Sequence, residues 1–436
     1  MKRMKPVPIF AIVAALALVC AVPLVADATP PSDNSFTPAA RATKAHGNQV
    51  IIDWNVHTQD ASGANSPPRR ARTFAMVSIA VHDALNGIEY KYARYANSAS
   101  DPLASPIAAA AQAAHDVLVA LFPAQEDSLA TKLATSLGAI NDQNALARGV
   151  ALGQAAAADL LALRANDGSD VVVTYTSTEL PGLWRPTPPA SAPALEPGWG
   201  NVTPFGMSSG SQFRSAAPYA LDSSEYATDW LEVRDYGSAT SSVRSADETS
   251  YAHFWYEPSA VAWNRLARAA LALRPKNIWK TARLFAMMNM AMADGYIASF
   301  DSKYAFDNWR PITAIREADS DGNLGTVPDV AWSPLRPTPP MPDQTSGHAV
   351  AGFASRAALV EVFGEDVDQP ITMTSTTAVP AGSTRSWETF TEAAHENAES
   401  RIKVGIHFRK ACNDGEIQGR AVGNWIVTKY FGEVSE

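Results

Sequence analysis

Cysteine is nearly absent from this chain of 436 residues, which carries only Cys20 and Cys412. Cys20 lies in an N-terminal segment that we expect to be removed, so the mature protein is expected to have no internal disulfide, even in a compartment that permits one. The stability must therefore come from the hydrophobic core. Roughly 400 residues are enough to bury a large core in one domain or in two halves.

An excess of positive charge is also lacking, since 35 Lys and Arg residues face 44 Asp and Glu residues and the formal net charge is −9. This sign disfavours nucleic acids and anionic membranes as partners. The eight histidines form no His-Glu-x-x-His motif and no Cys/His cluster, which disfavours a zinc hydrolase. No apolar run after residue 28 is long enough to predict a stable membrane anchor.

The N-terminus has the pattern of a secretory signal peptide. Basic residues at positions 2, 3 and 5 precede an apolar run over residues 9–25, which ends in the small-residue triplet Ala26-Asp27-Ala28. A transmembrane anchor is the alternative, but Pro23 interrupts the run and no basic stop-transfer residues follow it. We predict that residues 1–28 are a signal peptide and that the protein is secreted or periplasmic.

The spacing of apolar residues predicts an all-α fold made of two helical-bundle halves, residues 29–218 and residues 219–436. Residues 181–218 are rich in Pro, Gly and Ser and predict a long loop at the end of the first half. No run alternates cleanly enough to predict a buried sheet. The expected helices span residues 70–92, 107–122, 145–165, 261–273, 281–300, 347–363, 387–406 and 415–430.

Three separated segments of the second half carry candidate site residues. Lys303 and Arg310 are about two helical turns apart, so both cations are expected on one side of the same helix. The sequence Ser346-Gly347-His348 opens an apolar helix, where Ser is a good N-cap and the N–H groups of the first turn can bind an anion. Arg401 and His407 lie near a predicted helix end.

Each segment alone has an ordinary explanation, such as a solvated helix face or a capped helix. Together they supply three cations, a hydroxyl, a helix N-terminus and two imidazoles, which can hold and act on a small, multiply charged tetrahedral anion. His82 and His115, each beside an aspartate in a predicted helix, are interpreted as hydrogen-bonded helix residues. The methionines between residues 287 and 292 are interpreted as core filler.

The ordered motifs Lys303-x6-Arg310-Pro311, Ser346-Gly347-His348 and Ser400-Arg401-x5-His407 resemble the signature of vanadium-dependent haloperoxidases. Type 2 phosphatidic acid phosphatases and bacterial acid phosphatases share this signature. Residues 80–86, 199–205 and 308–316 are also similar to the soluble bacterial haloperoxidase branch. The resemblance implies an all-helical fold with a vanadate site in the C-terminal bundle.

The resemblance also implies a role for each residue of the set. His407 would be the ligand of vanadium and His348 the acid–base group, and Lys303 would also polarise the reacting peroxide. The substrates would be hydrogen peroxide with a halide or a small organic acceptor. In a phosphatase, His407 would instead be the nucleophile that forms a phosphohistidine. The oxygens of the bound vanadate or phosphate would be held by Lys303, Arg310, Ser346, Gly347 and Arg401.

Several positions depart from the family pattern. Thr345 replaces a frequent Pro, and Ala411 stands where many members have an Asp four residues after the vanadium ligand, with Asp414 three residues further on. The position that tracks halide choice is Met341, and Phe300 is a second candidate for the halide pocket. The large N-terminal helical half and the loop at residues 199–205 of an exported chain favour a haloperoxidase over an acid phosphatase. The lipid phosphatases with this signature usually carry several membrane spans, and no such span is visible after residue 28. A non-catalytic relative is a further alternative. The sequence does not identify the halide, and a homodimer is possible.

Overall fold

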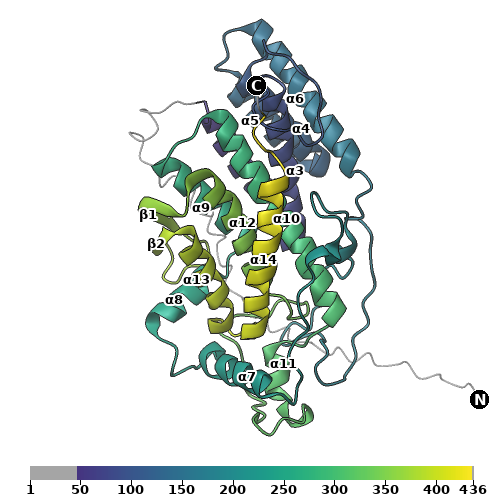
Figure 1. The fold of residues 1–436 in the computed structure, drawn as a ribbon, viewed down its shortest axis with the longest axis vertical. Coiled ribbons are helices and arrows are strands. Elements are labelled where there is room, and N and C mark those ends of the chain that lie inside the picture. Colours follow the sequence, from purple (N-terminus) through teal and green to yellow (C-terminus); the bar gives the residue numbers. More distant parts are fainter. Residues whose placement is uncertain (1–46, 435–436) are drawn as a thin grey trace, which may run out of the picture.

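The computed structural model describes residues 47–434 and is mostly helical, so the predicted all-α class is confirmed (Figure 1). The predicted signal peptide, residues 1–28, lies outside the described residues. The first helices are α2 (Gln49–Ala61), α3 (Pro67–Asn86), α4 (Pro106–Leu121), α5 (Glu126–Leu137) and α6 (Gln143–Arg164). Later helices are α7 (Ser224–Gly237), α8 (Ala246–Phe254), α9 (Ser259–Leu273), α10 (Ile278–Phe306), α11 (Pro311–Arg316), α12 (Gly347–Phe363), α13 (Phe390–Lys403) and α14 (Arg409–Lys429).

Helices α4, α5 and α6 form one end of the molecule (Figure 1). Gly149 and Gly153 of α6 let its axis approach α4, because a Cβ on Gly153 would lie 2.6 Å from the Ala109 carbonyl oxygen. By length and composition alone, α6 is the one helix among residues 47–434 that could cross a membrane, and 33% of its most apolar window is buried inside the protein. The small residues of both helices thus serve close packing.

Helix α10 runs through the middle of the molecule and packs against α3 on one side and α12 on the other. Its side chains from Thr281 to Phe300 are nearly all buried, and one hydrophobic cluster includes residues from both sides of position 218. Met287, Met288, Met290 and Met292 are fully buried in that cluster, which confirms their interpretation as core filler. The second half therefore shares its core with the first.

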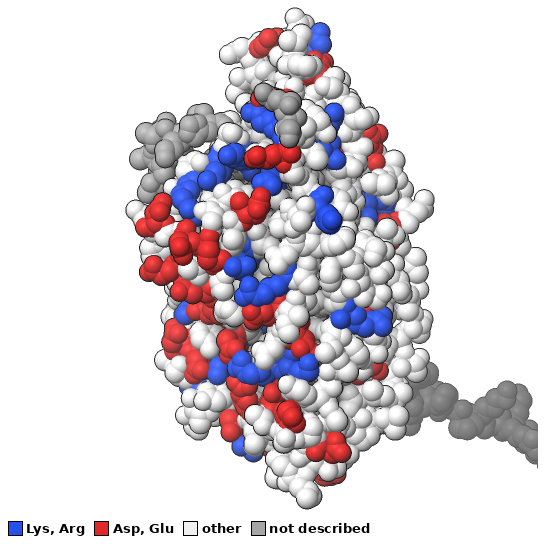
Figure 2. Space-filling model, viewed as in Figure 1, with Lys and Arg blue, Asp and Glu red and all other residues white. Residues whose placement is uncertain are grey.

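The long loop that follows α6 is irregular apart from two short 3-10 turns, Trp199–Asn201 and Gly210–Phe213. A buried carboxylate, Asp294 of α10, accepts hydrogen bonds from the backbone N–H groups of Phe205, Gly206 and Met207. These three bonds fix the loop against the central helix. Figure 2 shows acidic and basic residues intermingled on one part of the visible face, and a largely uncharged part on the side where Figure 1 draws this loop.

A row of glycines brings α14 against α12, the helix that begins at Gly347. Gly415, Gly419 and Gly423 recur every four residues and therefore share one face of α14. A Cβ on Gly419 would lie 2.5 Å from the Val350 carbonyl oxygen, and one on Gly415 would lie 3.0 Å from the Ser346 carbonyl oxygen. The close approach fixes the position of the α12 N-terminus, where the predicted Ser-Gly-His motif lies.

Two sequence-based expectations need correction. Residues 387–389, predicted as the start of a helix, belong to β2 (Thr384–Thr389), which pairs antiparallel with β1 (Asp366–Thr374). This hairpin was missed because only Ile371 and Met373 alternate inward on β1 while most of the strand is exposed. Helices α2, α5, α7, α8 and α11 were also not predicted, since they are short or have weak apolar periodicity.

We predict that Gly419→Ala lowers the free energy of unfolding by about 1–3 kcal/mol, because the added methyl group overpacks a backbone contact. Urea denaturation measures the change. The control is Gly432→Ala, whose Cβ would meet nothing within 4 Å. A Gly419→Ala protein that is as stable as the wild type would contradict the close packing of α12 and α14.

Candidate functional site

Lys303 and Arg310 are close in sequence but do not lie on one helix, so that expectation is wrong. Lys303 is in the last turn of α10, which ends at Phe306, and Asp307 then adopts a left-handed conformation with φ 52°. Arg310 is the residue before α11. The break turns the Arg310 side chain inward, where Nε donates to the Met341 carbonyl oxygen at 2.7 Å and Nη1 to the Ile406 carbonyl oxygen at 2.6 Å.

The Ser-Gly-His segment begins α12 as predicted. Ser346 is the N-cap, and its hydroxyl accepts a hydrogen bond from the Ala349 N–H. The first-turn N–H groups of Gly347 and His348 have no acceptor inside an α-helix and are available to an anion. Thr345, which replaces the usual Pro, donates its hydroxyl hydrogen to Gln418 Oε1 of α14 at 2.8 Å. The substitution thus adds a tie between α12 and α14.

Residues 341–346, before α12, form a buried loop that contacts the predicted cations. Lys303 Nζ donates to the carbonyl oxygens of Pro342 at 2.7 Å and Asp343 at 3.1 Å. The Ser346 N–H donates to the Ala411 carbonyl oxygen at 2.9 Å. This loop therefore joins the end of α10, the start of α12 and the start of α14.

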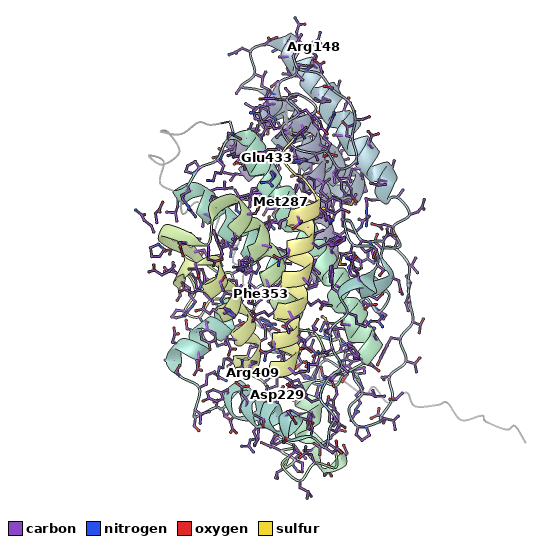
Figure 3. All side chains as sticks on the ribbon, in the orientation of Figure 1. Arg148, Asp229, Met287, Phe353, Arg409 and Glu433 are labelled. Carbon is purple, nitrogen blue, oxygen red and sulfur yellow. The ribbon has the colours of Figure 1, made fainter. Side chains whose placement is uncertain are left out.

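Arg401 and His407 lie on either side of the turn between α13 and α14. Arg401 is in the last turn of α13, and its Nη1 donates to the Trp255 carbonyl oxygen at 3.1 Å. His407 Nε2 lies 3.1 Å from Arg310 Nη1. The start of α14 is held against α7, because the Lys410 N–H donates to Asp229 and Arg409 pairs with Glu232. Figure 3 labels Arg409 and Asp229 at this junction. The turn that carries His407 is thereby anchored on both sides.

The structure therefore brings the seven predicted site residues, Lys303, Arg310, Ser346, Gly347, His348, Arg401 and His407, to one place. The residues Lys303, Arg310, Arg401 and His407 are at most 3% exposed. We call Lys303, Arg310 and Arg401 the cationic cluster. Among the described residues, Lys303 and Arg401 form no ion pair, and Arg310 has only the buried carboxylate Asp343, 3.7 Å away.

Burial and mutual repulsion lower the pKa values of these groups. Burial, then Arg310, holds the pKa of Lys303 well below its usual range. Burial lowers the pKa values of Arg310 and Arg401 to about 10. Arg401 Nε is also buried without a hydrogen-bond partner. A buried group of cations with unused donors fits a bound multivalent anion, which would supply both the missing charge and the missing acceptors.

The two imidazoles are held differently. His348 Nε2 lies 2.9 Å from the Glu257 carbonyl oxygen, to which only a protonated nitrogen can donate, so the lone pair is on Nδ1. Burial, then Arg401, lowers the pKa of His348 well below its usual range, and burial with the cations does the same for His407. Both rings are therefore neutral at pH 7 and able to accept a proton or bind a metal.

Two residues of the site were missed by sequence reasoning. Asp343 Oδ1 lies 2.8 Å from His407 Nδ1, and Glu257, which pairs with Arg265 at 2.6 Å, supplies the carbonyl group to His348. Asp343 could have been noticed as an acid among prolines three residues before Ser346. Glu257 acts through its backbone and gives no sequence signal.

The two halide-pocket candidates are buried near these elements. Met341 is 8% exposed and gives its carbonyl oxygen to Arg310, and Phe300 packs its ring against Tyr296 and Tyr304. Their proposed contact with halide stays a prediction. His82 and His115 lie 3.0 Å and 2.7 Å from the carboxylates of Asp83 and Asp116, in agreement with their interpretation as hydrogen-bonded helix residues.

Comparison with known sequences supports the same assignment. Residues 283–435, which hold all the predicted site residues, match the family model of the VCPO second helical-bundle domain. The vanadium chloroperoxidase of Curvularia inaequalis is 27% identical over 29% of this chain. The matched part spans 27% of that protein's length.

Comparison with solved structures extends the similarity to most of the chain. The crystal structure of the first bacterial vanadium-dependent iodoperoxidase has a TM-score of 0.76 and 28% identity, and the match covers 90% of this chain and 97% of that one. A holo-type bacterial vanadium-dependent chloroperoxidase shares the fold, with a TM-score of 0.67, 18% identity and coverage of 91% and 95%. Residues 283–435 therefore belong to the family of the VCPO second helical-bundle domain, and most of the chain has the fold of the bacterial vanadium-dependent haloperoxidases.

Proposed function

We propose that this protein is a vanadium-dependent haloperoxidase, which uses hydrogen peroxide to oxidise a halide to hypohalous acid. The observation that carries the proposal is the burial of three cations with a single nearby carboxylate, around two neutral imidazoles. Such a site is costly to bury unless an anion completes it. The relative with 28% identity, a bacterial iodoperoxidase, makes iodide the first halide to test.

Vanadate fits the residues present. Lys303, Arg310 and Arg401 supply positive charge for a tetrahedral dianion. Burial raises the pKa of Asp343, the one carboxyl group beside them, to about 7, so Asp343 offsets only part of that charge at pH 7. The three cations, the Ser346 hydroxyl and the Gly347 N–H would hold its oxygens. His407 would bind the metal through Nε2, since Nδ1 faces Asp343.

When bound, vanadate supplies a Lewis acid that activates hydrogen peroxide toward halide without a change in the oxidation state of the metal. Side chains of the protein would accept the proton of hydrogen peroxide and stabilise the negative charge on its oxygens. His348 Nδ1 carries the lone pair that accepts the peroxide proton, because Nε2 is engaged by the Glu257 carbonyl group. Lys303 stabilises negative charge on the reacting oxygens, and its burial strengthens that interaction.

An acid phosphatase is the second candidate, because the same charges fit a phosphate dianion equally well. His407 would then be the nucleophile, with Nδ1 held by Asp343, and His348 would protonate the leaving oxygen. For either activity, we propose that residues 1–28 direct the protein out of the cytoplasm. Its substrates would then be extracellular or periplasmic.

The first test is a matched pair of assays on the purified mature protein, with and without orthovanadate. One assay follows peroxide-dependent halogenation of a dye with iodide or bromide, and the other follows hydrolysis of an aryl phosphate. We expect halogenation only with vanadate, and loss of any phosphatase activity when vanadate is added. A robust phosphatase that oxidises no halide would contradict the haloperoxidase proposal.

A second prediction concerns stability. We expect vanadate at a hundredfold excess over its Kd to stabilise the wild-type fold by about 2.7 kcal/mol. Lys303→Met should abolish that response and leave the anion-free protein as stable or more stable, by about 1 kcal/mol, because it removes a buried charge. Thermal unfolding with and without vanadate measures both effects. Lys280→Met, at an exposed position of the same helix, is the control and should keep the full response.

A third prediction separates the two histidines. His348→Ala should lower kcat at least about 100-fold while vanadate affinity stays within a few-fold of wild type, because it removes the proton acceptor only. His407→Ala should lower vanadate affinity itself. Steady-state kinetics and equilibrium dialysis distinguish these effects, with His395→Ala, a half-exposed ring, as the control. If both alanine variants lost vanadate equally, the roles given to the two rings would be wrong.

A further inference from the structure

The buried carboxylate of Asp343 contacts the ring that would bind vanadium. Its side chain is 0% exposed, and Oδ1 lies 2.8 Å from His407 Nδ1 and 3.7 Å from Arg310 Nη1. A carboxylate in a cationic site has two possible effects. It either balances charge, or it orients the ring that it contacts.

The geometry of His407 points to orientation. The negative charge of the Asp343 carboxylate, 2.8 Å from Nδ1, favours the proton of the neutral ring on Nδ1 and thus leaves the lone pair on Nε2. Arg310 Nη1, a donor, lies 3.1 Å from Nε2 and 3.4 Å from Nδ1, so the ring as a whole lies against the cationic cluster. Because Asp343 occupies the Nδ1 side of the ring, Nε2 is the nitrogen left to bind a metal beside the cationic cluster.

The loop that carries Asp343 is rigid enough to orient a ring. The Asp343 N–H donates to the Asn308 carbonyl oxygen at 2.8 Å, and the Asp343 carbonyl oxygen accepts from Lys303 Nζ. After Asp343, the Thr345 hydroxyl donates a hydrogen bond to Gln418 of α14, and the Ser346 N–H donates to the Ala411 carbonyl oxygen near the start of that helix. The carboxylate is thus fixed by backbone contacts that do not depend on its own charge.

Other carboxylates nearby do not perform this role. Ala411 occupies the position four residues after His407, and the side chain of Asp414 contacts Gln344 Nε2 and Lys410 Nζ instead. We propose that Asp343 is the positioning residue of His407, which holds the ring so that Nε2 can bond to vanadium. This inference rests on the proposed function, since it assigns a partner to the vanadium ligand of that same site.

Removal of the Asp343 charge distinguishes charge balance from orientation of the ring, because the two roles predict opposite changes in vanadate affinity. If the carboxylate only balances charge, Asp343→Asn leaves a more positive site, and vanadate and phosphate should both bind more tightly. If it orients His407, vanadate, which bonds to the ring, should bind about 10- to 100-fold more weakly, as is typical when the partner of a metal-binding histidine is lost. Inorganic phosphate, which binds without a bond to the ring, should bind as well as before or better.

The experiment measures the affinities of the full mature chain for orthovanadate and for inorganic phosphate by equilibrium dialysis. The variants are Asp343→Asn and Asp343→Ala, and the matched control is Asp414→Asn, which removes a nearby buried carboxylate that does not contact His407. The double variant Asp343→Asn with His407→Ala should lose no more vanadate affinity than His407→Ala alone, since the carboxylate acts through the ring. Retained phosphate binding verifies that each variant is folded.

We expect weaker vanadate binding with unchanged or tighter phosphate binding in both Asp343 variants, and wild-type affinities in the control. A vanadate affinity that is unchanged, or that rises with that of phosphate, would overturn the positioning role while the proposed function stands. A loss of both anions in both variants would also overturn it, because Asp343 would then support the fold rather than the ring. A wild-type protein that binds no vanadate would overturn the proposed function, and this inference with it.

Discussion

The structure depends on one electrostatic constraint, the burial of three cations around a single point with one carboxylate to oppose them. Lys303, Arg310 and Arg401 come from three different helix ends, and each loses its hydration when the chain folds. Their lowered pKa values express the cost of charging them without a bound anion. A site of this kind lowers stability in return for affinity for an oxyanion.

The surrounding helices explain how the fold tolerates this cost. The glycine face of α14 locks the N-terminus of α12, and α10 joins the site to a core that extends into the first helices of the chain. Hydrophobic burial over this large core is the main source of stability that can offset the repulsion. The first half therefore stabilises the site by packing against α10, although the site residues themselves all belong to the second half.

The sequence predicted which residues lie near one another better than it predicted how the chain brings them together. Ser346 as an N-cap and Arg401 at a helix end follow from local patterns, because capping and helix termination are set by nearby residues. The break between Lys303 and Arg310 could not be inferred from their spacing, since the left-handed Asp307 that causes it is fixed by tertiary contacts such as the hydrogen bond from Tyr175. The contact of Asp343 with His407 joins residues 64 positions apart and depends on how two loops fold together.

A crystal structure of the mature protein grown with orthovanadate would show directly whether the buried cations hold this anion. We expect one vanadium centre bonded to His407 Nε2, with its oxygens within hydrogen-bond distance of Lys303, Arg310 and Arg401 and with His348 Nδ1 facing it. Vanadate bound elsewhere, or a cationic cluster that stays free of any anion at saturating vanadate, would contradict this expectation.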